Sequence, residues 1–147
     1  IHIGMGDLDD GRFDTPGWVD VAPMCCLLVH RKAFERIGYL DEKYFIYYED
    51  TDWAYRAKLL GIRIWYAAQC KIYHKVSSLT GGAKSRFTVY HATRGKIRFI
   101  NKFYFGFARY YWLIRYFAGF FVGLVLKRYT WFEFRVKLRA FLSTIKF

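Results

Sequence analysis

A change of composition near residue 84 divides the chain and restricts how it can fold. Residues 1–83 carry 10 Lys or Arg against 11 Asp or Glu, whereas residues 84–147 carry 14 Lys or Arg and one acid, Glu133. Twenty of the aromatic residues also lie in the second segment. We therefore expect a charge-balanced part and a basic, aromatic part that meets an anionic partner, either a membrane or a nucleic acid.

The apolar content and the cysteines narrow the class of protein further. Hydrophobic residues make up 54% of the 147 residues, which is enough to bury a core and excludes a disordered chain. The three cysteines, Cys25, Cys26 and Cys70, are odd in number and lack a CxxC spacing. A disulfide framework or a zinc site is therefore not expected, and a reducing compartment fits best.

The first segment has the pattern of an α/β domain. The nearly continuous apolar run at 19–29 predicts a strand buried on both faces, and 62–67 and 71–74 alternate as strands do. Helices are predicted at 31–37 and at 51–60, each closed by a glycine. This order supplies too few strands for a complete sheet.

The second segment has the pattern of successive helices. Its stretch 103–126 is strongly apolar, but Arg109 and Arg115 interrupt it. The uninterrupted run 116–126 is well short of the ~20 residues that a membrane-spanning helix needs. Thr130-Trp131-Phe132-Glu133 then matches a capping box and predicts a further helix.

Three carboxylates lie close together at Glu49, Asp50 and Asp52. One interpretation is helix capping, because negative charge is favourable at the positive end of a helix. The other is a general base, because a carboxylate partly desolvated by Tyr48 and Trp53 can take a proton from a hydroxyl. The residues alone leave both interpretations open.

His74 follows a predicted strand and precedes a Ser/Gly-containing loop at 77–82. A lone histidine in such a place is more often structural than a ligand. A neutral imidazole at the end of a strand is nonetheless a good metal ligand. This choice also stays open from the residues alone.

A series of motifs decides between these interpretations. It consists of GYLDEKYF at 38–45, YEDTD at 48–52, Arg56 and Gly61, and then Tyr90, Arg94, Phe99 and Lys102. Over roughly residues 17–103 this order resembles family 2 glycosyltransferases of the rhamnosyl- and galactofuranosyltransferase type. The resemblance implies that residues 1–83 are the C-terminal part of a GT-A type α/β domain. Residues 84–147 would then be a helical, membrane-facing extension.

The resemblance also implies roles for individual residues. Asp50 is expected to be the base that deprotonates the acceptor hydroxyl for inverting attack on the sugar, with Glu49 helping to place it. His74 is expected to complete the coordination of Mg²⁺ or Mn²⁺, which neutralises the leaving nucleotide diphosphate. Three further residues are expected to contact the substrate, namely Asp52, Trp53 and Lys75.

Two departures from the family pattern qualify this expectation. The family's nucleotide-binding half, with a D-x-D pair that holds the metal, has no clear counterpart, since Asp7-Leu8-Asp9 lies in a Gly/Asp-rich loop. Met24 stands near a position where the family usually has glycine, which leaves the sugar open. We therefore expect the chain to be incomplete.

Three interpretations fit the basic segment. Its aromatic residues could pack a helical cap, or its cations could bind nucleic acid, although no RNP, KH or helix-turn-helix signal is present. The third interpretation is an anionic membrane surface, contacted by residues Trp131, Arg135, Lys137 and Arg139. A peripheral position on the cytoplasmic face of the plasma membrane is expected.

The expected function is transfer of a sugar from a nucleotide sugar to a lipid-linked or cell-surface glycan. The alternative is a non-enzymatic module that binds membrane or nucleic acid and retains a decayed catalytic motif.

Overall fold

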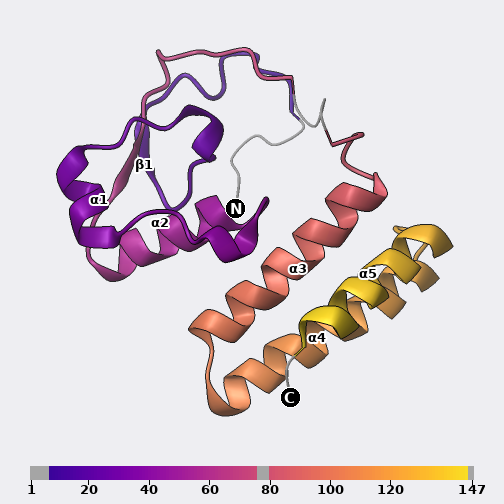
Figure 1. Cartoon of the computed structure of the whole chain (residues 1–147). Helices are drawn as coiled ribbons and strands as arrows, with labels where there is room; N and C mark the ends of the chain where they lie inside the picture. The colour runs from indigo at the N-terminus through magenta and orange to yellow at the C-terminus, as the bar shows by residue number, and fades with distance from the viewer. Residues whose placement is uncertain (1–6, 76–79, 146–147) are drawn as a thin grey trace. The chain divides into compact units, whose positions relative to one another are not determined.

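The computed structural model describes residues 7–75 and 80–145. Its residues group into two compact units (Figure 1). The first contains the chain up to Glu42 together with Glu49–His74, and the second contains Lys43–Tyr48 together with the chain from Lys75 onward. Helices dominate the described residues, in which the one sheet has two strands.

The first unit contains this sheet. Strand β1 (Gly17–Val19) pairs antiparallel with β2 (Ile64–Tyr66), so that Trp18 lies opposite Trp65. The two indole rings meet edge to face at 4.8 Å, and the guanidinium of Arg63 lies 3.9 Å from the centre of the Trp18 ring. Aromatic and cation–π contacts of this kind stabilise a strand pair that is too short to be stable through its backbone alone.

The structure corrects part of the predicted α/β pattern. The strand predicted at 19–29 is wrong, because β1 ends at residue 19 and a short 3-10 helix, η1 (Met24–Cys26), follows. Pro23 precedes η1, and proline cannot donate to a strand ladder. The prediction at 62–67 is confirmed by β2, whereas 71–74 forms no strand among the described residues.

The first unit has two α-helices, and both were predicted. Helix α1 (Arg31–Ile37) begins after His30, whose Nδ1 accepts the backbone N–H of Lys32 at 3.1 Å. It ends at Gly38, which adopts φ +83°, a conformation that glycine reaches without a steric penalty. Helix α2 (Glu49–Leu59) begins two residues earlier than predicted, so that the acidic residues form its first turn.

The core of the first unit lies between these helices and the chain around η1. Its buried residues are Ile37, Trp53 and Ala57. Partly buried residues pack around them, namely Met24, Leu27, Val29, Ala33, Phe34 and Ile62. A second 3-10 helix, η2 (Glu42–Tyr44), follows α1 at the boundary between the units.

The second unit is helical, as predicted. Helix α3 (Arg86–Phe103) begins where the hydroxyl of Ser85 accepts the N–H of Thr88, and α4 (Gly106–Val125) follows after a short turn. Helix α5 (Trp131–Thr144) packs against both. The predicted capping box at the start of α5 is confirmed. The hydroxyl of Thr130 accepts the backbone N–H of Glu133, and the carboxylate of Glu133 accepts the backbone N–H of Thr130.

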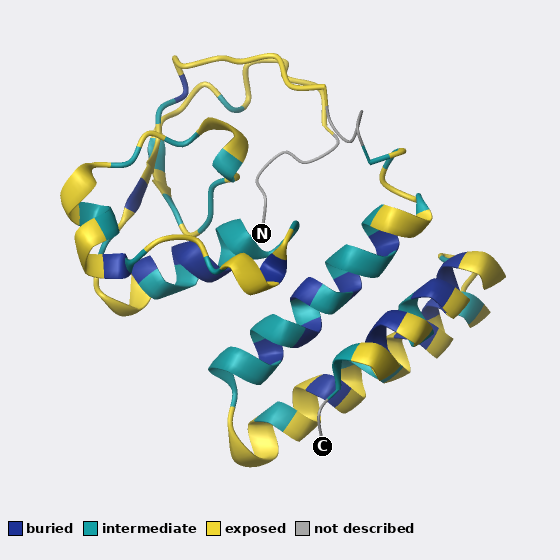
Figure 2. Ribbon diagram, viewed as in Figure 1, coloured by how far each residue is buried: buried dark blue, intermediate teal, exposed yellow. Residues whose placement is uncertain are grey.

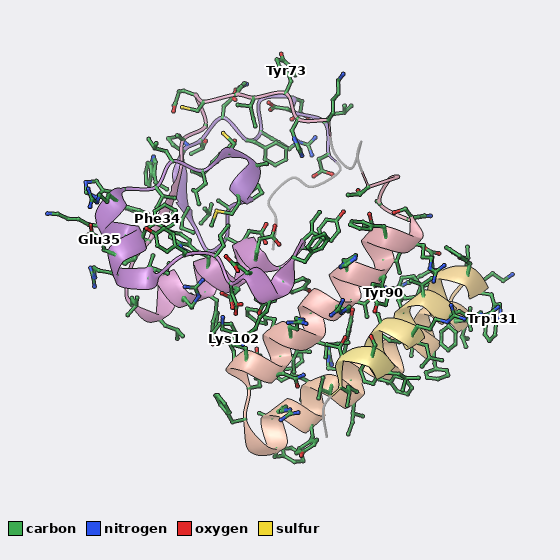
Figure 3. All side chains as sticks on the ribbon, viewed as in Figure 1. Phe34, Glu35, Tyr73, Tyr90, Lys102 and Trp131 are labelled. Atoms are coloured by element: carbon green, nitrogen blue, oxygen red, sulfur yellow. The ribbon has the colours of Figure 1, made fainter. Side chains whose placement is uncertain are left out.

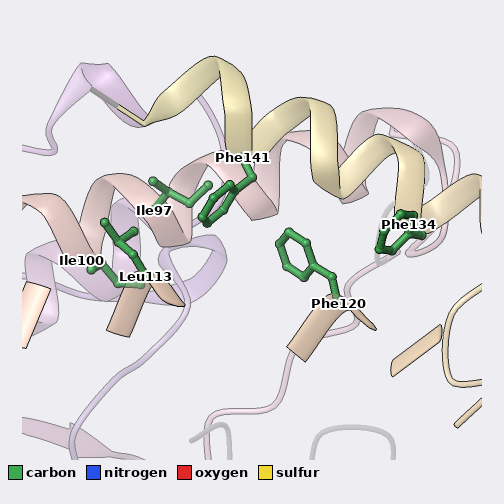
Figure 4. Close-up of a cluster of buried hydrophobic side chains, with 6 residues drawn as sticks. All are labelled: Ile97, Ile100, Leu113, Phe120, Phe134 and Phe141. Carbon is green, nitrogen blue, oxygen red and sulfur yellow. The ribbon is translucent and has the colours of Figure 1, made fainter. Parts of the chain in front are cut away.

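One cluster of buried side chains joins the three helices of this unit (Figure 4). Helix α3 contributes Ile97 and Ile100, α4 contributes Leu113 and Phe120, and α5 contributes two phenylalanines. The rings of Phe120 and Phe141 meet edge to face at 5.8 Å. Aromatic residues account for half of the cluster, which explains part of the high aromatic content of the segment.

Helix α4 exposes several apolar side chains, and Figure 2 shows exposed residues recurring along the helices of the second unit. Phe107, Ile114, Phe121 and Val125 follow at intervals of seven, seven and four residues, which places them on one side of a helix. Within the described ranges, no helix is long and apolar enough to cross a membrane.

Candidate active site

The first turn of α2 carries the two carboxylates that the sequence singled out as catalytic. Glu49 and Asp50 are its first two residues, and both are half-buried. One carboxylate oxygen of Asp50 accepts the backbone N–H of Thr51 at 2.6 Å and the Thr51 hydroxyl at 3.2 Å. This arrangement orients Asp50 and satisfies one of the N–H groups that a helix leaves unpaired at its start.

One carboxylate oxygen of Glu49 lacks the hydrogen-bond partner that helix capping would give it. Its Oε2 is buried and has no hydrogen-bond partner among the described residues. Burial raises the pKa of Glu49, and the neighbouring charge of Asp50 raises it further, while a bond from its own backbone N–H opposes both effects. A buried acceptor without a partner is rare in folded proteins, and a hydroxyl of a bound molecule would satisfy it.

The backbone immediately before these carboxylates is strained. Phe45, Tyr47 and Tyr48 have φ angles of +61°, +65° and +75°, in the left-handed region that bulky residues avoid. Each such residue costs about 1–3 kcal/mol and persists only where its surroundings enforce it. Strain of this kind concentrates at functional sites.

Helix α3 provides the enforcing contacts within the second unit. A Cβ placed on Gly95 would come 2.7 Å from the carbonyl oxygen of Tyr47, so the approach requires glycine at this position. The Tyr47 hydroxyl lies 3.1 Å from that of Thr88, and the Tyr48 ring lies 6.1 Å from the Phe99 ring. These contacts hold the two residues that precede Glu49 in their strained form.

Asp52 and Trp53 point into the first unit rather than toward solvent. Asp52 is fully buried, and its Oδ2 accepts the Nε–H of Arg56 at 2.8 Å. Arg56 also donates to the carbonyl oxygens of Ile37 and Tyr39 at 2.6 and 2.8 Å. This pair therefore joins α2 to the end of α1.

Trp53 makes a similar connection. It is buried, its indole N–H donates to the carbonyl oxygen of Gly38 at 2.9 Å, and its ring packs 5.7 Å from that of Phe34. Both residues thus stabilise the unit, and a further contact of either with substrate stays a prediction.

His74 and Lys75 are both exposed, at the end of the first unit and the start of the second. In the part of the chain that the structure describes, no three His, Cys, Asp or Glu side chains lie close enough to hold a metal ion. The described residues therefore do not form a metal site by themselves, and His74 could supply only one ligand. Residues 77–79 of the predicted loop lie outside the described residues.

The residues predicted to contact a membrane differ in their exposure. Trp131, Arg135 and Arg139 are exposed on α5, and Figure 3 shows Trp131 at the outer edge of the helices. Lys137 is half-buried, with its ammonium 4.4 Å from the centre of the Tyr129 ring. Lys137 therefore points toward the interior of the helical unit, while the other three could reach a surface.

The sequence contains a local signal for two of these structural features. Arg56 lies four residues after Asp52, the spacing at which opposite charges meet on a helix. Gly95 stands in the middle of an amphipathic helix, where glycine costs stability unless a close contact requires it.

Comparison with known proteins adds an independent finding. A 54-residue stretch, 37% of the chain, is 41% identical to the low-salt glycan biosynthesis hexosyltransferase Agl10 of Haloferax volcanii. A 65-residue stretch, 44% of the chain, is 37% identical to the N-acetylglucosaminyl-diphospho-decaprenol L-rhamnosyltransferase of Mycobacterium tuberculosis. Part of this chain is similar to glycosyltransferases. The resemblance inferred from the motifs is thereby confirmed over a partial stretch.

The chain spans only a small part of these two relatives. The matched stretches cover 17% and 20% of the two relatives, so the chain spans about a fifth of their length or less. The chain matches no family model, and no solved structure matches it.

Proposed function

We propose that this chain carries the acceptor-activating carboxylates of a glycosyltransferase with a GT-A type domain. The observation that carries the proposal is the half-buried pair Glu49 and Asp50, at the first turn of α2 and directly after two strained tyrosines. Capping accounts for Asp50 but not for the buried, unpartnered oxygen of Glu49. The glycosyltransferase relatives support the same chemistry.

In the proposed reaction Asp50 takes the proton from an acceptor hydroxyl as that oxygen attacks the anomeric carbon of the donor sugar. The bond between the sugar and the nucleotide diphosphate breaks, and the diphosphate leaves with the bonding electrons. In-line attack from the opposite side inverts the anomeric centre. A positioned base contributes ~10²–10⁴ to the rate of such a step.

The environment of the pair supports different roles for its two members. Burial raises the pKa of Glu49, so Glu49 holds its proton to a higher pH than an exposed glutamate does. A protonated Glu49 would donate a hydrogen bond to the acceptor and would reduce repulsion near Asp50. Adjacent carboxylates in unlike environments divide acid and base roles in this way.

Donor and acceptor are also part of the proposal. A nucleotide sugar would supply the glycosyl group. A lipid-linked or cell-surface glycan would receive it, in keeping with the decaprenol-linked substrate named for the mycobacterial relative. Since the chain spans so little of its relatives, most of the donor site would be formed by sequence outside these 147 residues.

A divalent metal, Mg²⁺ or Mn²⁺, belongs to the same proposal. His74 would contribute one imidazole, and the remaining ligands would come from outside the described residues. Titration of the complete native protein with Mn²⁺ tests this, and an affinity unchanged by His74→Ala would contradict it.

The activity test uses the complete native protein with a panel of nucleotide sugars and a short-chain lipid diphosphate glycan as acceptor. Mass spectrometry should detect an acceptor enlarged by one sugar, and NMR should show an inverted anomeric configuration. Binding of membrane or oligonucleotides without turnover of any donor would instead favour the non-enzymatic alternative.

We also propose that the second unit lies on an anionic membrane surface, on its cytoplasmic face. The apolar side of α4 would enter the boundary between headgroups and acyl chains, as the side chains of interfacial helices do. The surrounding segment carries 14 basic residues and one acid, and each basic residue near an anionic leaflet contributes ~1 kcal/mol. Trp131, Arg135 and Arg139 are exposed and could share the contact.

Replacing Ile114 and Phe121 with serine should weaken vesicle binding by about tenfold or more, because each buried apolar side chain contributes roughly 1.5–3 kcal/mol. Co-sedimentation with anionic and neutral vesicles over a salt series measures this, and binding should fall as salt rises. The control Ala108→Ser changes an exposed residue elsewhere on α4. Equal binding by all variants would exclude the α4 surface, and efficient competition by oligonucleotides would favour nucleic acid.

A further inference from the structure

Each helix of the second unit contributes one cation to a cluster that is distinct from the carboxylate site. Lys96 comes from α3, Arg115 from α4 and Lys137 from α5. Burial lowers the pKa of Lys96, and the charge of Arg115 lowers it further. Burial also lowers the pKa of Lys137, while the charge of Glu133 raises it and the charge of Lys96 lowers it. Lys96 is thus close enough to Arg115 and to Lys137 for their charges to interact with its own.

The folded chain offers these cations little negative charge in return. Glu133 is the one acid of residues 84–147, and its Oε2 accepts both the N–H and the hydroxyl of Thr130, at 2.7 and 2.9 Å. Within the described ranges neither Lys96 nor Arg115 takes part in a salt bridge. Lys96 is half-buried, whereas Arg115 is exposed. A half-buried cation without a counter-charge is unfavourable, so the position of Lys96 needs an explanation.

Aromatic contacts compensate only in part. The ammonium of Lys96 lies 4.5 Å from the centre of the Tyr116 ring, and the guanidinium of Arg115 lies 5.7 Å from that of Trp112. Cation–π contacts contribute about 0.5–2 kcal/mol and do not cancel repulsion between neighbouring cations. They do hold both charged groups in defined positions.

The two cations line the same cavity, whose volume is about 230 Å³. Its other lining residues are Ile100, Trp112, Tyr116, Gly119, Phe120 and Tyr129. This volume exceeds the ~30 Å³ of a single water and falls below the ~300–1,000 Å³ of most small-molecule sites. The cavity therefore suits a small anionic group rather than an entire nucleotide sugar.

We propose that this cavity binds a phosphate or diphosphate group between the side chains of Lys96 and Arg115. A phosphate carries up to two negative charges, which matches the two cations, and guanidinium and ammonium groups are its usual partners in proteins. The aromatic walls would contact the apolar or sugar group attached to it. Lys137 adds positive potential nearby, since its ammonium lies 4.4 Å from the centre of the Tyr129 ring, which lines the cavity.

Two sources could supply this chemistry, a lipid headgroup and a soluble phosphate. If the bound phosphate belongs to a lipid-linked acceptor, that identity rests on the proposed function. Binding itself does not rest on it, because the cluster lies entirely within the second unit. A protein without transferase activity would still bind phosphate here, so the two proposals fail separately.

The test is isothermal titration of the 147-residue chain with three probes: inorganic phosphate, pyrophosphate and monomeric dihexanoyl phosphatidic acid. Lys96→Met and Arg115→Gln should each weaken binding of the preferred probe by about 10–100-fold, the effect of losing one hydrogen bond to a charged group. Arg86→Gln is the matched control, since it removes one charge from α3 ten residues before Lys96, about 15 Å along the helix.

Thermal unfolding separates a binding role from a structural one. Lys96→Met removes a half-buried cation and should leave the Tm unchanged or raise it, although phosphate binding is weakened. Preference for phosphatidic acid would identify a lipid headgroup, whereas preference for pyrophosphate would identify a soluble ligand. No saturable binding of any probe, or equal weakening by Arg86→Gln, would overturn the proposal.

Discussion

Asp52→Ala is expected to destabilise the folded chain by about 3 kcal/mol, the lower end of the ~3–5 kcal/mol for breaking a buried ion pair. The Asp52 side chain is fully buried and that of Arg56 is 19% exposed, so solvent would stabilise the remaining guanidinium poorly. The value lies at the lower end because Arg56 keeps its two backbone acceptors, Ile37 and Tyr39. Urea unfolding followed by circular dichroism measures the change.

Glu35→Ala provides a matched control on α1. Glu35 pairs with Arg31 at the same i,i+4 spacing and at 3.0 Å, but both side chains are mostly exposed. Exposed pairs contribute about 0–1 kcal/mol, so this variant should unfold at nearly the wild-type urea concentration. Similar losses for the two variants would show that burial of Asp52 has no special role.

Asp50→Asn in the complete native protein is expected to lower kcat by about 10²–10⁴ and to change the KM for the donor little, because only the base is lost. Asparagine preserves the size of the side chain and an oxygen that can accept the Thr51 N–H. The control Asp20→Asn removes an exposed carboxylate that pairs with Lys58 at 2.8 Å, and it should leave kcat unchanged.

Glu49→Gln tests how the catalytic roles are divided between Glu49 and Asp50. If Glu49 acts as the protonated member of the pair, glutamine preserves a donor, and kcat should fall much less than in Asp50→Asn. A near wild-type kcat for Asp50→Asn would restore the capping interpretation of Asp50. A larger loss for Glu49→Gln than for Asp50→Asn would exchange the two roles.

Several features could be predicted from the sequence because their causes lie within a few residues. The end of α1 at Gly38 and the capping box at Thr130 and Glu133 depend on backbone and side-chain groups less than two turns apart. The helix α2 was likewise predicted, although it begins at Glu49 rather than at residue 51. An ordered series of short motifs likewise sufficed to predict the similarity to glycosyltransferases, which the comparisons confirm over part of the chain.

The strand predicted at 19–29 shows where local patterns stop being sufficient. An apolar run becomes a strand buried on both faces only if neighbouring strands and covering layers exist. Among the described residues β1 has a single partner, and the run continues beyond it as coil and a 3-10 helix that packs on α1 and Trp53. The prediction of burial on both faces is therefore wrong as well, since Leu28, Cys25 and Cys26 are exposed.

The sequence by itself determined the helices, their caps and the position of the carboxylates at a helix start, since each follows from interactions within one or two turns. Only the tertiary structure decided which charges are buried. Asp52 meets Arg56 inside the first unit, whereas in the second Lys96 lies half-buried near the charges of Arg115 and Lys137, with no salt bridge among the described residues. The last three come from different helices, up to 41 residues apart, and only the packing of those helices brings their charges together.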